Sequence, residues 1–567
     1  MPKLVDDPIT ADPRTAGYFE PIIDSWWQHS RILIVLDGGL SISADNDFGI
    51  SMAIAHIRGF KTGFASFSVT LARREGFSRT NIEAGPEDYT YTGFRFDQRE
   101  GSPLGPYTLH KYDQVWLFGF FPGNGPKNDP NDLSATRELA VDKPEFHPTS
   151  EGELKVLSQW MDAGGGVFAA GDHHQLGASM CKRIPRVSTM RRWLATDGVP
   201  TRNGNTRFDT RQPLYYDEYE PTPQPIRWVP VLDSYLGPLP RHAPHPILCH
   251  PQHGPIDVLP GHMHEGRCYD PGDFEWHVEY AHTTDKFGDY RIEHYPSSDG
   301  VRPLPQAIAF GTTLGTIRRD GPQPFRETPL IVAYDGQRVS RGRVVVDSTW
   351  HHWFDLNLKP LDKPEVQIER EKIFRFYANV AIWLASPNWR SGALIGEIKR
   401  EQFRYFGREQ FSAHLESAQL GSVARELLNP RIGPCWVWNL AEESFADIGV
   451  QIQRTGSGLW PHLNGSSRDY FCSMFVGEMV KLAYADQPET ELLIADGQLK
   501  PTRIFEEDPL HLAREAARRA SAAIAKAWRK EIVSGETLLK LFEAAGTSAV
   551  EKNDRRKPTK RRSRRRR

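Results

Sequence analysis

Three short groups of histidine and acidic residues are candidates for chemistry. They are Asp172-His173-His174, His262 with His264 and Glu265 in GHMHEG, and His351-His352. Neutral imidazoles with one or two carboxylates suit a divalent metal ion, and an ion with an open coordination position can activate water. The same residue types can also exchange protons without a metal. The groups therefore predict a metal site for Zn, Mn or Fe, or an acid–base site.

We expect His173, His264 and His352 to be the main site histidines. The candidate catalytic residues are Asp172, His173, His174, Glu265 and His352. The candidate metal ligands are His173, His262, His264, His351 and His352. In the second group, the two histidines two residues apart would share one face of an extended strand. The alternative is structural, because the chain has 20 histidines and such pairs often contain one buried, hydrogen-bonded ring.

Strand and helix patterns alternate around these groups. Apolar or alternating runs predict strands at 31–37, 64–71, 112–121, 167–170, 306–311, 329–334 and 342–347. Amphipathic patterns predict helices at 47–59, 150–163 and 367–385, with Ser150 as the cap of the second. We expect a doubly wound parallel sheet in three layers, with Asp37 and the first and third polar groups at the carboxyl ends of its strands.

Three segments of the chain resemble the class I glutamine amidotransferase-like superfamily, most nearly its ThuA-like branch. These segments are ILIVLDGG, GGGVFAAGDHHQLG and GRVVVDSTWHH. The resemblance covers about residues 30–385 and implies a flavodoxin-like fold. The chain departs from it at residues 169–173, which hold no Cys, Ser or Thr where the amidotransferases carry a nucleophilic Cys. Glutamine hydrolysis through a thioester is therefore not expected, and Cys181 is interpreted as a buried helix residue.

The length of 567 residues predicts more than one domain. The predicted units are a lead-in at 1–30, an α/β domain at 31–388 with an insertion at about 200–300, a helical domain at 389–547 and a basic tail at 548–567. The insertion is rich in Pro, His and aromatic residues and has no sustained period. Its segment RHAPHPILCHPQHG has the composition of a metal-binding tract, but its prolines favour an irregular loop packed over the sheet.

The formal charge of -2 hides an asymmetry between the tail and the rest of the chain. Residues 551–567 hold eleven Lys or Arg against Glu551 and Asp554, which gives the tail about +9 and the remainder about -11. Such a tail is expected to be disordered, and it could bind nucleic acid or another acidic partner nonspecifically or add solubility. The aromatic residues typical of specific single-strand binding are absent from it.

Five scattered cysteines and the lack of a signal peptide or long apolar run predict a reduced, cytoplasmic protein without a membrane segment. Two functions remain open. The first is a hydrolase, or a related lyase or isomerase, acting on a small polar molecule through the His/Asp/Glu groups. The second is an amidotransferase-like domain without its nucleophile, which acts as a sensor or scaffold through the helical region and the tail. Self-association through the helical region would be compatible with either.

Overall fold

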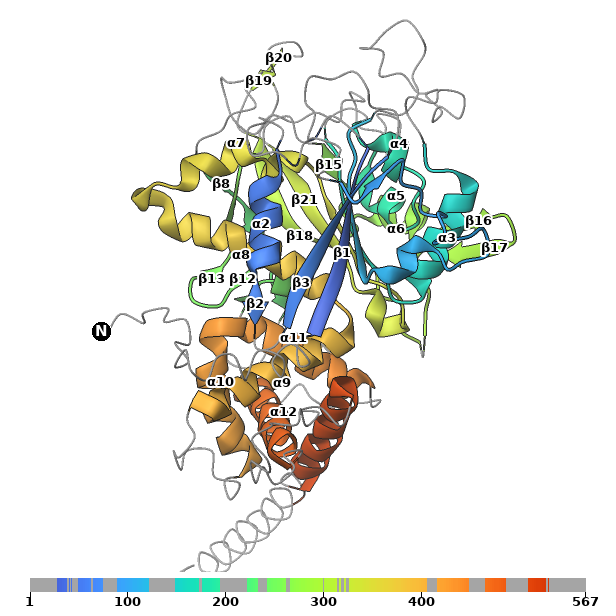
Figure 1. The fold of residues 1–567 in the computed structure, drawn as a ribbon. Coiled ribbons are helices and arrows are strands. Elements are labelled where there is room, and N and C mark those ends of the chain that lie inside the picture. Colours follow the sequence, from blue (N-terminus) through green and yellow to red (C-terminus); the bar gives the residue numbers. More distant parts are fainter. Residues whose placement is uncertain are drawn as a thin grey trace, which may run out of the picture.

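The structure of the chain, a computed structural model, has an α/β part above a helical part in the view of Figure 1. It describes residues 28–37, 40, 42, 49–62, 65–74, 89–121, 148–172, 176–193, 222–232, 242–261, 266–298, 300–313, 316–317, 321–322, 326–404, 416–447, 465–485, 508–526 and 529. Among the described helices, none combines the length and the apolar character needed to cross a lipid bilayer.

A mixed sheet of ten strands forms the centre of the α/β part. Five parallel strands lie in the spatial order β3-β1-β5-β6-β22. Their bounds are β1 Gln28–Leu36, β3 Ala65–Arg73, β5 Gln114–Phe118, β6 Gly166–Ala170 and β22 Val344–Asp347. Most of their residues are buried, as expected for parallel strands that are covered on both faces. The prediction of an α/β fold with a mostly parallel central sheet is confirmed.

The sheet continues beyond β22 with antiparallel strands. These are β21 (Arg326–Tyr334), β18 (Gln306–Thr313) and β9 (Arg227–Trp228), while the short strands β2 (Lys61–Thr62) and β4 (Tyr91–Thr92) pair with β3 at the other edge. The expectation of a wholly parallel sheet is wrong here. Only a short connection containing the 3₁₀ turn η4 (Gly336–Val339) joins β21 to β22, and parallel pairing needs a longer crossover.

Helices cover both faces of the sheet. One face carries α2 (Ser51–Gly59) and α8 (Gln367–Leu384), and the other carries α3 (Glu151–Asp162), α4 (Ala178–Cys181) and α5 (Val187–Met190). Alternate residues of β1 enter opposite cores: Ile32 and Ile34 face the α8 side, whereas Leu33 and Val35 face the α3 side. This alternation gives the three layers that the sequence predicts.

The start of α3 is stabilised by a capping box, and it confirms Ser150 as the predicted cap. The Ser150 hydroxyl accepts a hydrogen bond from the backbone N–H of Glu153, and the Glu153 carboxylate accepts one from the N–H of Ser150. The same carboxylate lies 2.7 Å from the guanidinium of the fully buried Arg74. The cap thus also neutralises a buried cation beside the sheet.

The insertion contains mostly short elements. Those between β6 and β18 are β7 Arg191–Arg192, β8 Gln224–Pro225, β10 Val231–Leu232, β11 His242–Ala243, η3 Pro246–Leu248, β12 Cys249–His250, β13 Gly254–Pro255, β14 Val258–Leu259, β15 Arg267–Cys268, α6 Phe274–Tyr280, β16 Thr284–Phe287 and β17 Tyr290–Glu293. The remaining short elements are η2 Thr108–Lys111, β19 Thr316–Ile317, β20 Gly321–Pro322, η5 Trp350–Trp353, α7 Asp355–Leu358, η6 Lys359–Leu361 and η7 Pro364–Val366. Two-residue pairings are consistent with the predicted lack of a sustained period.

The helical part of the chain packs against the amino ends of the strands. It contains α9 (Pro387–Arg404), α10 (Ser417–Ile432), α11 (Pro434–Asp447), α12 (Gly465–Ala485) and a further helix at 509–526. The indole N–H of Trp389 in α9 lies 3.0 Å from the carbonyl oxygen of Gln28 and 3.3 Å from that of Ser66. The helical region therefore covers the end of the sheet opposite to the carboxyl ends of β1 and β3 (Figure 1).

A carboxylate that is distant in the sequence caps helix α2. The N-cap residue Ile50 offers no side-chain hydrogen bond, but Asp355 accepts hydrogen bonds from the backbone N–H groups of Ser51 and Met52 at 3.0 and 2.8 Å. Asp355 follows the His351-His352 turn, so the cap ties this turn to α2.

Replacing Asp355 with Ala should lower the free energy of unfolding by about 1–2 kcal/mol, because the first turn of α2 loses its cap. Urea unfolding of the full chain measures this change. Asp362→Ala is the control, because its exposed carboxylate forms a surface ion pair with the partly exposed Arg370, and such pairs contribute little to stability. Equal effects of the two substitutions would show that Asp355 is not a cap.

Candidate functional site

The turns that follow β6 and β22 bring Asp172 and His351 together. Ala170 in β6 lies opposite Asp347 in β22, so the carboxyl ends of both strands lie side by side. We call this end of the sheet the carboxyl edge. Thr349 donates a hydrogen bond from its hydroxyl to Oδ1 of Asp172 at 2.9 Å, and Nε2 of His351 lies 3.4 Å from Oδ2 of Asp172. The first and third polar groups of the sequence therefore meet at this edge through these three residues.

Aromatic side chains enclose the His351 ring. Its centroid lies 5.2 Å from that of Trp350 and 5.0 Å from that of Phe354. The backbone N–H of His351 also donates to the Thr349 hydroxyl at 3.0 Å, which holds the main chain of the turn in place. His351 and Asp172 are both about 1% exposed. Exclusion of water strengthens the electrostatic coupling between this imidazole and carboxylate.

The buried Arg191 side chain joins the two turns. Its Nη2 donates to the carbonyl oxygens of Asp172 at 2.6 Å and Ser348 at 2.8 Å. The guanidinium lies over the Trp193 ring at 4.4 Å, and burial lowers the pKa of Arg191. Three backbone carbonyl oxygens, including that of Arg192, thus surround a cation inside the protein. Neither turn can move without disturbing Arg191.

The insertion reaches the same edge at Gly266. The backbone N–H of Gly266 donates to the carbonyl oxygen of Ser348 at 3.2 Å. A Cβ atom at this position would lie 2.0 Å from Nη2 of Arg191 and 2.7 Å from the carbonyl oxygen of Asp172, so only glycine fits without a shift. Gly266 directly follows Glu265, and the second polar group is therefore joined by covalent bonds to this edge.

Five of the predicted site residues lie outside the described residues. They are His173, His174, His262, His264 and Glu265. Asp172 directly precedes His173 and Gly266 directly follows Glu265, and both of these flanking residues lie at the carboxyl edge. The backbone N–H of Asp172 donates to the carbonyl oxygen of Leu176 at 3.1 Å.

His352 lies in the core and pairs with Asp347. Its Nδ1 lies 2.8 Å from Oδ1 of Asp347, and the indole N–H of Trp353 donates to Oδ2 of the same carboxylate at 3.0 Å. The hydroxyl of Tyr377 in α8 donates to the carbonyl oxygen of His352 at 2.5 Å. His352 and Asp347 are fully buried. This arrangement favours a positioning role for His352 over the direct role that the sequence suggests.

Asp37 adds a buried carboxyl group at the end of β1. Its Oδ1 accepts hydrogen bonds from the backbone N–H groups of Phe120 and Phe121 at 2.6 and 3.3 Å, whereas Oδ2 has no hydrogen-bond partner among the described residues. Burial raises the pKa of Asp37 to about 7, although both hydrogen bonds and the nearby Arg74 oppose the shift. The carboxyl group is therefore ready to change its protonation state near neutral pH.

The stability of the protein relative to an Asp37→Asn variant should fall as the pH rises from about 4 to about 7. The native state keeps the proton of Asp37 up to about pH 7, whereas the unfolded chain releases it near pH 4. Protonation thus favours the native state, and this stability is lost as the pH rises through the native pKa. The slope should reach at most about 1.4 kcal/mol per pH unit. Urea unfolding of both proteins at several pH values measures it, and a constant difference would contradict the raised pKa.

No protein-family model matches this chain, and no curated protein matches it. Cys181 is fully buried in α4, and burial raises the pKa of its thiol well above the usual value. This agrees with its interpretation as a helix residue and not as a nucleophile.

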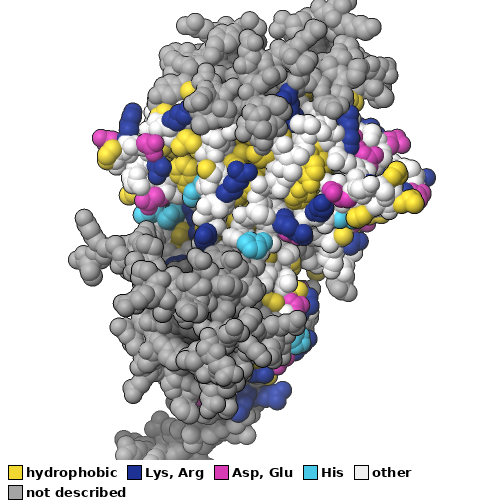
Figure 2. Space-filling model, in the orientation of Figure 1, with side chains coloured by type: hydrophobic (Ala, Val, Ile, Leu, Met, Phe, Trp, Pro, Cys, Tyr) yellow, Lys and Arg dark blue, Asp and Glu magenta, His cyan; other side chains and the backbone are white. Residues whose placement is uncertain are grey.

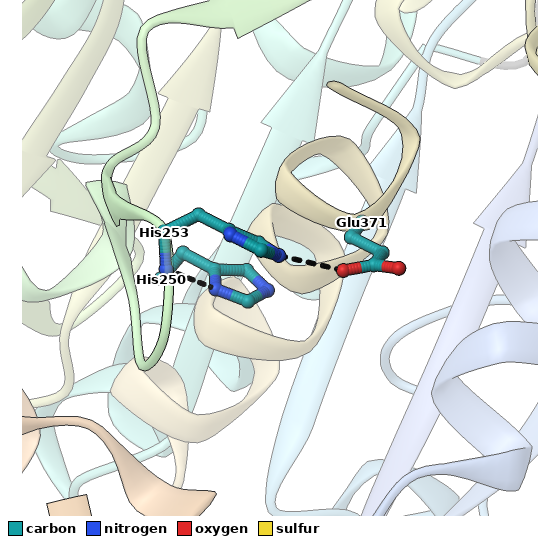
Figure 3. Close-up of side chains that lie close together, drawn as sticks. All are labelled: His250, His253 and Glu371. Carbon is teal, nitrogen blue, oxygen red and sulfur yellow. Dashed lines mark hydrogen bonds and ion pairs between the residues drawn. The ribbon is translucent and has the colours of Figure 1, made fainter. Parts of the chain in front are cut away.

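A second group of polar residues lies away from this edge. Among the described residues, His250, His253 and Glu371 form a group whose potential ligand atoms all lie within 4.8 Å of one another and could hold a metal ion (Figure 3). The two imidazole rings stack with centroids 4.4 Å apart, and Nε2 of His253 lies 2.7 Å from Oε2 of Glu371. Burial and the neighbouring His253 lower the pKa of His250 to about 4, so its ring is neutral at neutral pH.

The structure separates the histidines of the predicted metal tract. His245 accepts a hydrogen bond at Nδ1 from the backbone N–H of Ile247 and packs against Trp383, which is a structural arrangement. The side chain of His242 lies outside the described residues. Only the fold reveals Glu371 as the partner of the last two histidines, because it lies over 100 residues later in α8. Thr349 was visible in the sequence beside His351, but its hydroxyl could not be assigned to Asp172 without the strand order.

Proposed function

We propose that the chain is a hydrolase, or a related lyase or isomerase, that acts on a small polar molecule in the cytoplasm at the carboxyl edge of its sheet. The convergence of Asp172, Thr349 and His351 is the observation that carries this proposal. The strand order β3-β1-β5-β6-β22 corresponds to 2-1-3-4-5 among the parallel strands, and it supports a flavodoxin-like fold of the amidotransferase-like type. Ligands bind at this edge in such sheets.

The imidazole of His351 is the group that we assign to proton transfer. Asp172 orients the ring through Oδ2. The hydroxyl of Thr349 donates a hydrogen bond to Oδ1 of Asp172 and thereby orients the carboxylate. Arg191 and the Asp347–His352 pair hold the two turns in place.

The histidines joined to this edge suit a divalent ion of the Zn, Mn or Fe type. In the sequence, His173 follows Asp172, and the segment with His262, His264 and Glu265 directly precedes Gly266, so imidazole and carboxylate donors are joined through the chain to this edge. We propose that His173 and His264 hold the ion, with His262 as a further ligand. When bound, the ion would supply an activated water for hydrolysis.

Asp172→Asn and His351→Gln should each reduce kcat/KM by about 10²–10⁴-fold, because the acid–base pair is lost. Hydrolysis of p-nitrophenyl acetate, p-nitrophenyl phosphate and p-nitrophenyl glucoside by the full chain measures the effect. Metal analysis of the same preparations, with His173→Ala and His264→Ala added, should show that these two variants have lost bound Zn, Mn or Fe.

Cys181→Ala is the matched control for this experiment. It removes a buried thiol near the edge and should leave kcat/KM unchanged, because the turn after β6 carries no nucleophilic thiol. Turnover that depends on Cys181 and not on His351 would overturn the assignment, as would a metal content that is the same in every variant.

The second candidate function is that of a catalytically inactive binding or scaffold protein. It is favoured by Asp172, which stands in the turn after β6 where the amidotransferases have their nucleophile. On the face shown in Figure 2, described Lys and Arg side chains are interspersed with Asp and Glu. In this second function, the basic residues 548–567 would bind nucleic acid or another acidic partner nonspecifically.

Deleting residues 548–567 should weaken binding to double-stranded DNA, and the affinity of the full chain should fall steeply with salt. Fluorescence anisotropy with a labelled duplex at two salt concentrations measures both effects. A full chain that binds no DNA, or a truncated chain that binds equally well, would contradict this second function.

A further inference from the structure

We propose that His250, His253 and Glu371 form a second, exchangeable site for a divalent transition metal, best matched by Zn²⁺, and that metal binding rearranges the turn at residues 250–253. The ligands come from the β12–β13 hairpin of the insertion and from the first half of α8 (Figure 3). None of the three belongs to the carboxyl-edge site, so this proposal is independent of the proposed reaction.

The donor set fits Zn²⁺. Two imidazole nitrogens and one carboxylate oxygen are a common set of three protein ligands, and they leave a fourth tetrahedral position open. With bonds of about 2.0–2.1 Å, the ligand atoms around such an ion lie about 3.3 Å apart. The observed ligand atoms lie within 4.8 Å of one another, while the His253–Glu371 pair is closer, at 2.7 Å. Side-chain movements of the order of 1 Å would therefore form the site.

Water can reach the group from one side. The side chain of Glu371 is 41% exposed and that of His253 is 24% exposed, whereas His250 is 8% exposed. An ion could thus enter beside Glu371 and displace the hydrogen bond between Glu371 and His253. The fourth position would remain open to water or to a ligand from solution.

The hydrogen bonds of His250 explain why the site would be exchangeable. Nδ1 of His250 accepts hydrogen bonds from the backbone N–H groups of Gln252 at 3.1 Å and His253 at 3.0 Å. The proton of the neutral ring must then be on Nε2, the nitrogen that points toward Glu371 in Figure 3. A metal bound at Nε2 would shift this proton to Nδ1.

A protonated Nδ1 would face the two backbone N–H donors of Gln252 and His253. Metal-bound histidines normally donate their second ring N–H to an oxygen atom, so the turn must release both backbone hydrogen bonds to satisfy the bound state. Binding is therefore coupled to a change in the backbone at residues 250–253. This coupling weakens the affinity and distinguishes the site from a permanently occupied structural zinc site.

Titration of the metal-free full chain with Co²⁺ tests the site, because visible absorption reports tetrahedral coordination and Zn²⁺ should then displace the signal. Glu371→Gln and His253→Ala should each bind about tenfold or more weakly. Glu369→Gln is the matched control, since it removes a partly buried carboxylate from the same helix and should bind like the wild type. Asp172→Asn should also keep this affinity, which separates the site from the carboxyl edge.

Hydrogen–deuterium exchange of the peptide that contains Gln252 and His253 tests the coupling. Exchange should become faster when Zn²⁺ is added to the wild type and should stay unchanged in Glu371→Gln. Absence of Co²⁺ or Zn²⁺ binding, or equal binding by wild type and Glu371→Gln, would overturn the site. Metal binding with unchanged exchange at these amides would overturn the rearrangement.

Discussion

The parallel pairing of β6 with β22 is the constraint on which the carboxyl edge depends. It places Asp172 beside Thr349, although 177 residues separate them in the chain. The two turns then share Arg191, whose buried cation is surrounded by carbonyl oxygens from both sides. Because a buried guanidinium needs these acceptors, the geometry of the turns and the position of the cation determine each other.

Different parts of the chain contact the two ends of the parallel strands. At the amino ends of β1 and β3, Trp389 and the rest of α9 join the sheet to the helical region. Two buried arginines, Arg343 and Arg390, reinforce this junction by sharing Glu443. At the carboxyl ends, the insertion approaches through Gly266. The contacts with the helical region and the group around Asp172 and His351 are thus separated by the length of the strands.

Much of the α/β architecture could be predicted from the sequence, because buried parallel strands are continuous apolar runs and Ser150 begins a recognisable capping box. The antiparallel strands β18 and β21 were found as strands, but their direction depends on the short connection to β22. Asp172 and His351 could be placed at one edge from strand order alone. The burial of His352 against Asp347 could not, since two adjacent histidines look alike until packing separates them.

The late position of β22 has a consequence for synthesis of the chain. The strands β1, β3, β5 and β6 are complete by residue 170, but the neighbour of β6 begins only at residue 344. During translation, one side of β6 therefore keeps its backbone groups unpaired while about 170 further residues emerge. An apolar, unpaired strand is prone to association with other chains. Folding of this protein in the cell should accordingly depend on how that transient edge is protected until β22 arrives.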